Sequence, residues 1–223
     1  MKKSQVQLLK DDAITYRLMN QQDLQESADC FTHSFQREPM VRHLKIQKED
    51  FHSFALVCCQ QAIDQGLGLV AVAEATQKIA GFTILQDALD DLQIDLTNYQ
   101  FLLPIFEMLG QLQSQYISGK NVKQNGEVIV SFVTGVYPEF EGSKIAFSLF
   151  GQSIELAKSK NYQKMITEVT GRLSQNGVRR RYSFTPYSSI LYRDFLFEGK
   201  RIFDGLEDST LSCVLMEKNL TDQ

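Results

Sequence analysis

The chain has 223 residues, of which 43% are hydrophobic, and this is enough apolar material for a single domain over residues 1–223. Its formal net charge of −4 argues against a nucleic-acid or membrane-surface binder, because those proteins carry an excess of basic residues. No stretch approaches the roughly 20 apolar residues of a membrane-spanning helix, and the amino-terminal residues lack the apolar stretch of a signal peptide. We therefore expect a cytoplasmic protein with no membrane or nucleic-acid partner.

The four cysteines have no regular spacing, which fits reduced thiols in a cytosolic protein better than a disulfide framework. Two of them, Cys58 and Cys59, fall within a helical pattern, where small buried residues are favoured over a reactive pair. The three histidines lie on polar flanks and the chain has no Cys-x-x-Cys motif, so we expect no metal site.

At the amino-terminal end, alternation of apolar and polar residues predicts a strand over Ala13–Met19. Asn20 is a good amino-terminal cap, and apolar residues then recur on one helical face as far as Phe35. This helix should end before Pro39, because the residue that precedes a proline is pushed out of the helical region. A second amphipathic helix is predicted over Phe51–Ile63.

Two further strands, Leu67–Glu74 and Ile79–Gln86, are separated by a short polar turn, and this pattern predicts an antiparallel hairpin. Apolar residues then share one face of a helix within Asn98–Tyr116. This helix lies between the third and fourth strands, and we interpret it as an insertion at about residues 97–117.

The segment Val128–Val136 is apolar on both faces and predicts a buried strand. Pro138 cannot continue the sheet, and from Ile145 apolar side chains return at helical spacing. A helix that follows a short glycine-containing turn presents unpaired backbone N–H groups and the positive end of its dipole. This strand, turn and helix therefore suit a phosphorylated ligand.

The carboxyl-terminal part predicts a strand over Met165–Thr170, a short helix over Ser174–Tyr182, and closing strands over Ile190–Phe197 and Thr210–Glu217. The complete order is strand, two helices, three strands, helix, strand, helix and two strands, with the inserted helix before the fourth strand.

Pro138, Gly142 and Ala146 follow one another in the turn after the central strand. Their order resembles the acetyl-CoA signature of the GNAT superfamily of N-acetyltransferases. That signature is Gln/Arg-x-x-Gly-x-Gly/Ala after a strand that ends in Val-x-Pro. Glu141 stands where Gln or Arg is usual and Lys144 where the first Gly is usual, so two of three signature positions depart. The side chain of Lys144 would either crowd the diphosphate of the cofactor or add a cation beside it.

The element order over about residues 13–217 is similar to that of the GNAT acyl-CoA N-acyltransferase fold. The resemblance implies an α/β (α+β) chain with a mixed, mostly antiparallel seven-stranded sheet, splayed between strands 4 and 5, and helices on both faces. The gap between those strands would admit the pantetheine arm of acetyl-CoA. Gly135 would either mark a bulge that creates this gap or be a small residue under a neighbouring aromatic. The residues implied for cofactor binding are Thr134, Gly135, Val136, Glu141, Gly142, Ser143, Lys144, Ile145, Ala146 and Arg179.

The stretch from Phe35 to Pro39 resembles the Phe-x-x-Glu-Pro-Leu stretch of arylalkylamine N-acetyltransferases of the insect dopamine-acetylating type. This resemblance implies that Glu38 is the general base. An alkylammonium group is protonated at neutral pH and has no lone pair, so a base must remove its proton before the nitrogen attacks a thioester. The alternative is an exposed turn carboxylate paired with Arg37 or Arg42.

Many GNAT enzymes use a Tyr four residues before a Gly-Phe pair as the proton donor to the CoA thiolate. Here Ser183 replaces that Gly and Arg179 stands at the Tyr position. Tyr182, Tyr187 and Tyr192 are nearby candidates, of which we select Tyr182, and a buried structural tyrosine is the alternative for each. Arg179 itself could bind the 3′-phosphate of CoA, or it could belong to a solvated helix face.

The resemblance implies an acetyl-CoA-dependent N-acetyltransferase that acts on the primary amine of a small molecule, such as an arylalkylamine or a polyamine. Acetyl-CoA would be a co-substrate, no metal would be needed, and a homodimer is compatible with it. The alternative is a GNAT-fold protein that binds acyl-CoA or regulates without catalysis. That alternative rests on the departures at Glu141 and Lys144 and on the missing tyrosine.

Overall fold

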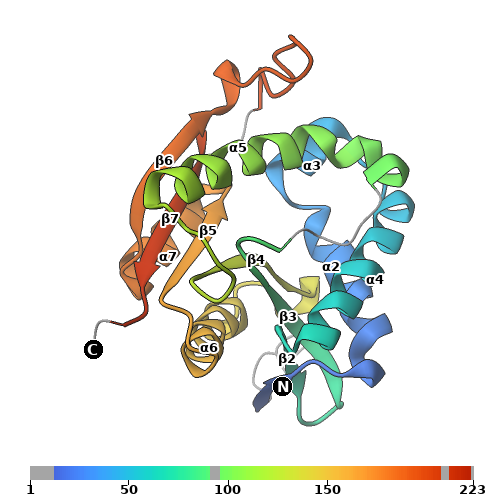
Figure 1. Cartoon of the computed structure of the whole chain (residues 1–223). Coiled ribbons are helices and arrows are strands. Elements are labelled where there is room, and N and C mark those ends of the chain that lie inside the picture. The colour runs from blue at the N-terminus through green and yellow to red at the C-terminus, as the bar shows by residue number, and fades with distance from the viewer. Residues whose placement is uncertain (1–12, 91–95, 207–210, 222–223) are drawn as a thin grey trace. The chain divides into compact units, whose positions relative to one another are not determined.

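The computed structural model describes residues 13–90, 96–206 and 211–221, and the elements appear in Figure 1. The strands are β1 (Ile14–Leu18), β2 (Gly68–Ala73), β3 (Lys78–Asp87), β4 (Val128–Val136), β5 (Lys164–Val169), β6 (Thr185–Leu191) and β7 (Ser212–Asn219). The helices are η1 (Gln21–Asp23), α2 (Leu24–Phe35), α3 (Pro39–Leu44), α4 (Lys48–Gln65), η2 (Leu96–Leu102), α5 (Leu103–Lys120), η3 (Pro138–Phe140), α6 (Ile145–Ser159), α7 (Arg172–Tyr182) and η4 (Tyr192–Asp194).

Seven strands form one sheet in the order β1-β2-β3-β4-β5-β7-β6. β4 and β5 pair in parallel over Val128–Val130 and Lys164–Ile166, whereas β1 with β2, β2 with β3, β5 with β7, and β6 with β7 are antiparallel. The predicted mixed, mostly antiparallel sheet with helices on both faces is therefore confirmed.

The chain divides into two compact units. The first contains residues 13–36, 47–86 and 131–156, and the second contains residues 37–46, 87–90, 96–130, 157–206 and 211–221. The division falls inside β4, directly after its pairing with β5. The predicted parting of β4 from β5 near Thr134 stays a prediction, because Thr134 and β5 belong to different units.

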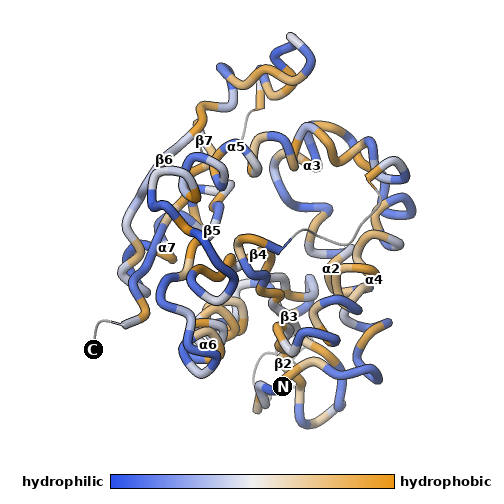
Figure 2. Tube along the Cα trace, in the orientation of Figure 1, coloured by the Kyte–Doolittle hydropathy of each residue, from blue (hydrophilic) through white to orange (hydrophobic). Residues whose placement is uncertain are grey.

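In the first unit, α2 and α4 bury aromatic side chains against one face of the sheet. Phe31 lies with its ring centroid 5.0 Å from that of Phe82 on β3 and 5.1 Å from that of Phe51 on α4. Hydrophobic and hydrophilic residues alternate along both helices in Figure 2, as expected for helices with one buried face. Asn20 and Asp23 form a capping box at the start of this helical region, as the sequence indicates for Asn20.

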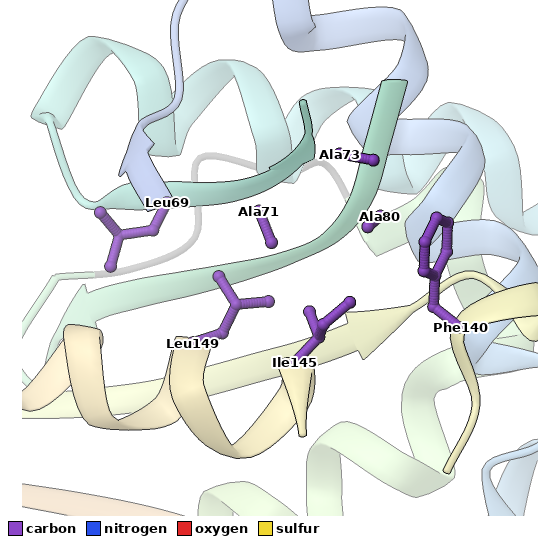
Figure 3. Close-up of a cluster of buried hydrophobic side chains, with 7 residues drawn as sticks. All are labelled: Leu69, Ala71, Ala73, Ala80, Phe140, Ile145 and Leu149. Carbon is purple, nitrogen blue, oxygen red and sulfur yellow. The ribbon is translucent and has the colours of Figure 1, made fainter. Parts of the chain in front are cut away.

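On the opposite face of the first unit's strands, α6 packs on small side chains of β2 and β3 (Figure 3). Ile145 and Leu149 of α6 are one helical turn apart and both are buried. Small strand residues let the helix approach the sheet closely. The cluster consists of Leu69, Ala71, Ala73, Ala80, Phe140, Ile145 and Leu149.

In the second unit, α5 lies across β6 and β7 (Figure 1). Tyr116 is fully buried, and its hydroxyl donates to Glu217 Oε2 on β7 at 2.9 Å. Lys120, one turn further along α5, donates from Nζ to Glu217 Oε1 at 2.9 Å. The ring of Tyr187 on β6 meets that of Tyr116 edge-on at 4.9 Å. Polar and aromatic contacts therefore hold the predicted inserted helix against β6 and β7.

Two elements differ from the predictions. The short helix α3 is not predicted, and β6 covers Thr185–Leu191 rather than Ile190–Phe197. Pro186 argues against a strand in the sequence, but β6 is an edge strand, where proline is tolerated. Tyr192 then turns out of the sheet into η4, and its hydroxyl donates to the Thr170 carbonyl at 2.8 Å. The predicted start of the last strand, Thr210, lies outside the described residues.

Within the described ranges, no helix is long and apolar enough to cross a membrane. The same residues contain no cluster of three or more histidine, cysteine or acidic side chains able to hold a metal ion.

Candidate functional site

The predicted strand, turn and helix lie in the first unit as β4, η3 and α6. Phe140 is 3% exposed and anchors the turn, because its carbonyl accepts the Ser143 N–H at 3.1 Å. Gly142 has φ = 71°, a left-handed conformation that favours glycine. Ser143 Oγ then accepts the Ile145 N–H at 3.3 Å, at the start of α6. The fold therefore builds a compact turn ahead of a 15-residue helix, as the sequence indicates.

The two side chains that depart from the acetyl-CoA signature, Glu141 and Lys144, are both exposed. Neither is packed into the protein interior. Ile145 is buried, and Ala146 is half-buried. The turn thus keeps its polar side chains toward solvent while the apolar residues of α6 fix it to the sheet.

The end of β4 is held firmly by side-chain and close-packing contacts. Thr83 Oγ1 donates to the Val133 carbonyl at 3.0 Å, so Thr134 is left to donate to Thr83 Oγ1 at 2.7 Å. A Cβ on Gly135 would collide with the Ser34 side chain and would lie 2.7 Å from Phe82 Cε1. This contact supports the interpretation of Gly135 as a small residue under an aromatic.

In the second unit, Glu38 is the amino-terminal cap of α3. Its Oε2 accepts the Val41 N–H at 2.9 Å, and Pro39 occupies the first helical turn, where its missing N–H costs nothing. Glu38 is half-buried, and its Oε1 atom is buried. Glu38 is therefore less exposed than the alternative interpretation expects, and its role as general base stays a prediction.

A second carboxylate, Glu168 on β5, belongs to the same neighbourhood and is not predicted from the sequence. Burial raises the pKa of Glu168 to about 7, against a smaller opposing effect of its hydrogen bond with Gln113 on α5. Burial also raises the pKa of the Cys213 thiol, and the charges of Glu168 and Glu38 raise that pKa further. Both carboxylates therefore lie close to Cys213. In the sequence, the one sign of this buried carboxylate is a Glu within the strand predicted over Met165–Thr170.

The tyrosine candidates occupy three different settings. Tyr192 is 2% exposed and its hydroxyl bonds to the Thr170 carbonyl, which fits a structural role. Tyr187 packs on Tyr116, and the Nζ of Lys120 lies 5.0 Å from its ring centroid, which also fits a structural role. Tyr182 is half-buried at the end of α7. Its role as proton donor stays a prediction.

Arg179 lies exposed in the last turn of α7, next to Arg180 and Arg181. Arginines near the carboxyl end of a helix interact favourably with its dipole, so this position is consistent with a solvated helix face. Its contact with the 3′-phosphate of CoA stays a prediction.

The two units offer different chemistry, each considered by itself. The turn in the first unit offers backbone N–H groups at a helix start, which suits phosphate oxygens. The region around Cys213 in the second unit offers two carboxylates, which suit a cationic group and can accept a proton. Phosphate binding and proton removal are two requirements of an acyl-CoA-dependent transfer to an amine.

The seven-stranded sheet, with its parallel β4–β5 pair and helices on both faces, is the architecture of the GNAT fold. No protein-family model and no curated protein matches the chain.

Solved structures share the fold over almost the whole chain. The C-terminal condensation domain of Ebony, in complex with beta-alanyl-dopamine, matches with a TM-score of 0.83 and 18% identity, over 93% of this chain and 99% of that one. Arylalkylamine N-acetyltransferase 2 from Aedes aegypti matches with a TM-score of 0.73 and 18% identity, over 94% and 100%. The protein yncA from Salmonella typhimurium, with its cofactor acetyl-CoA, matches with a TM-score of 0.55 and 12% identity, over 95% and 96%. The chain therefore has the fold of GNAT acetyltransferases.

Proposed function

We propose that the chain is an acetyl-CoA-dependent N-acetyltransferase that transfers the acetyl group to a primary amine of a small molecule by direct attack. The observation that carries the proposal is the position of Glu38, which caps α3 through one oxygen and has its other oxygen buried. Its charge also raises the pKa of the buried Cys213 thiol. A similar structure is an arylalkylamine N-acetyltransferase, and another holds acetyl-CoA. Both support this reaction class.

Under this proposal, Glu38 is a general base, and backbone N–H groups at the end of β4 stabilise the oxyanion of the tetrahedral intermediate. The turn before α6 holds the diphosphate of acetyl-CoA. Arg179 binds the 3′-phosphate, and Tyr182 protonates the departing thiolate. The other proposed contacts to the cofactor come from Thr134, Gly135, Val136, Glu141, Gly142, Ser143, Lys144, Ile145 and Ala146. A cytoplasmic location, a metal-free reaction and a homodimer stay predictions.

The first experiment measures release of free CoA from acetyl-CoA with a broad panel of small primary amines. Glu38→Gln should lower kcat by about 10²–10⁴, which is the usual contribution of a general base. Its affinity for acetyl-CoA, measured by calorimetry, should equal that of the wild type, because Gln keeps the shape and can still cap α3. Normal turnover in Glu38→Gln would remove Glu38 from the mechanism.

The second candidate is a GNAT-fold protein that binds acyl-CoA, or regulates, without catalysis. The departures at Glu141 and Lys144 favour it. Calorimetry with acetyl-CoA, CoA and unrelated nucleotides separates the two. Tight binding of acetyl-CoA without turnover of any amine would support this second candidate, and turnover with any amine in the panel would exclude it.

A further inference from the structure

One face of the sheet in the second unit carries Glu168 beneath α5. In antiparallel pairs, residues directly opposite each other point to the same face. Glu168 lies opposite Leu215 on β7, and Leu215 lies opposite Ser188 on β6. The three side chains therefore form a row across β5, β7 and β6. The hydrogen bond between Glu168 and Gln113 places α5 over the β5 end of this row.

Two polar atoms in this row are buried without a partner. Glu168 Oε1 and Ser188 Oγ have almost no solvent contact and make no hydrogen bond within the described residues. Native proteins rarely leave such atoms unsatisfied, because each one loses the free energy of its bonds to water. A buried carboxyl that is only partly satisfied by its own protein has capacity for a ligand.

A second observation links Glu168 to Glu38, the proposed general base for the amine. The charges of Glu168 and Glu38 both raise the pKa of the buried Cys213 thiol, so each carboxylate lies in the neighbourhood of this residue. Glu38 reaches this place from the start of α3, and Glu168 from β5. Two carboxylates in the neighbourhood of one buried residue favour the binding of a cation there.

We propose that Glu168 is a second carboxylate of the acceptor site, which binds the ammonium group of the amine and removes its proton before attack. This inference rests on the proposed function and refines it. An ammonium loses two protons on its way to an amide. Glu168 takes the first, and Glu38 takes the second from the more acidic nitrogen of the tetrahedral intermediate.

The proton and electron balance is complete with these two groups and Tyr182. The ammonium and the Glu168 carboxylate become a neutral amine and a Glu168 carboxylic acid. The amine lone pair forms the C–N bond with the thioester carbon, and the C–S bond breaks with its electron pair on sulfur. The second proton passes from nitrogen to Glu38. Tyr182 gives its own proton to the CoA thiolate, and the proton held by Glu38 restores Tyr182. Glu168 afterwards releases its proton to solvent.

The raised pKa of Glu168 fits the first of these steps. An alkylammonium has a pKa near 10.4, so transfer to an ordinary Glu with a pKa near 4.3 is unfavourable by a factor of about 10⁶. Transfer to Glu168, whose pKa is about 7, is unfavourable by a factor of only about 10³. Glu168 is therefore a better acceptor for the first proton than a carboxylate with an ordinary pKa.

The other titratable groups around this face are engaged elsewhere or lie at its border. Tyr116 and Lys120 of α5 bond to Glu217. The Nε2 atom of His43 in α3 lies 3.1 Å from the carbonyl oxygen of Ile202. Gln113 of α5 bonds to Glu168, and Cys213 of β7 carries the thiol whose pKa the charges of Glu168 and Glu38 both raise. Arg37 precedes Glu38 and is the cation nearest to it in the sequence.

The test compares the full chain with Glu168→Gln and with Glu107→Gln, a matched control on the exposed surface of α5. The pH dependence of kcat/KM for an acetylated amine is measured from pH 5.5 to pH 9.5. The wild type and the control should show an acidic limb with a pKa near 7. Glu168→Gln should lose this limb and fall by about 10²–10⁴ near pH 7, with a deficit that shrinks toward pH 9.5 as free amine accumulates.

A binding measurement supplies a second readout that does not depend on turnover. Amines are titrated calorimetrically into the CoA complex at pH 7 in two buffers of different ionisation enthalpy. Because Glu168 must be ionised to hold an ammonium, binding should release about half a proton per amine in the wild type. Glu168→Gln should release none. Its melting temperature and its affinity for CoA should match those of the control, which verifies folding.

The outcomes separate this inference from the proposed function. A wild-type acidic limb and wild-type proton release in Glu168→Gln would overturn the role of Glu168 while acetylation itself stands. A selective loss of diamines with an unchanged limb for monoamines would also overturn it, in favour of a specificity role. Proton release that depends on Glu168, without acetylation of any amine, would support amine binding by Glu168 and overturn the proposed function. The absence of amine binding altogether would overturn both.

Discussion

Gly135 in β4 has no room for a side chain. A Cβ there would lie 2.8 Å from Ser34 Cβ and 2.7 Å from Phe82 Cε1, and both belong to well-packed elements. We expect Gly135→Ala to lower the free energy of unfolding by about 1–3 kcal/mol through overpacking. Urea denaturation measures this change.

Gly110 in α5 is the matched control, because nothing lies within 4 Å of the Cβ it would carry. Alanine in a helix interior is better than glycine by about 0.5–1 kcal/mol, so Gly110→Ala should stabilise the protein. Equal effects of the two substitutions would show that Gly135 is not held by close packing.

Individual site residues were predictable only where a local motif marks them. Glu38 precedes a proline at the end of a helical pattern, and this combination is visible in the sequence. Glu168 is the one charged residue of the strand predicted over Met165–Thr170, and a charged residue in a strand usually has an outward-facing side chain. Its burial depends on Gln113 and Cys213, which are more than 40 residues away on either side, and no local pattern contains that information.

At the scale of elements, α5 is tied to β7 through the carboxylate of Glu217. Burial would raise the pKa of Glu217, but the hydrogen bonds from Lys120 and Tyr116 outweigh it and lower that pKa. A lowered pKa means that the folded state favours the carboxylate. The stability that Glu217 contributes is therefore present above its unfolded pKa of about 4.3 and is lost as the pH falls through its folded pKa.

We expect Tyr116→Phe to lower the free energy of unfolding by about 1–2 kcal/mol at pH 7, because Glu217 loses a hydrogen bond to a charged oxygen. The deficit should shrink as the pH falls through the lowered folded pKa of Glu217, where this carboxylate becomes protonated. Tyr16→Phe is the control, since the Tyr16 hydroxyl makes no hydrogen bond within the described chain. A deficit independent of pH would show that ring packing, rather than Glu217, makes the difference.

Element types and order were largely predictable, because strong apolar periodicity marks β4 and α6 at their observed starts. The exceptions have physical reasons. α3 has six residues, too few for a periodic pattern, and it forms because Glu38 and Pro39 supply a cap and a first turn. β6 contains a proline and a bulge between Pro186 and Ser188, and only its place at the sheet edge permits both.

At the scale of the whole molecule, all four cysteines are buried, and for Cys58 and Cys59 this agrees with the prediction of small buried residues in a helix. Cys30 lies in α2 and Cys58 and Cys59 in α4, all in the first unit, whereas Cys213 lies in the second. Burial raises the pKa of Cys59 to about 12 and that of Cys58 well above its usual value. Thiol labelling of the folded protein therefore requires opening of the unit that holds each cysteine.

This distribution makes the labelling rates a test of where acetyl-CoA binds. Acetyl-CoA at 100 times its Kd should slow the labelling of Cys30, Cys58 and Cys59 by about 100-fold if opening of the first unit destroys the cofactor site. The reason is that bound ligand reduces the population of the open state by a factor of 1 + [L]/Kd. Peptide mapping by mass spectrometry resolves the individual rates, and ATP serves as the control nucleotide. Unchanged labelling rates of the cysteines in the first unit under saturating acetyl-CoA would contradict a cofactor site built on β4, η3 and α6. A ligand bound to these three elements must lower the population of any open state in which they come apart.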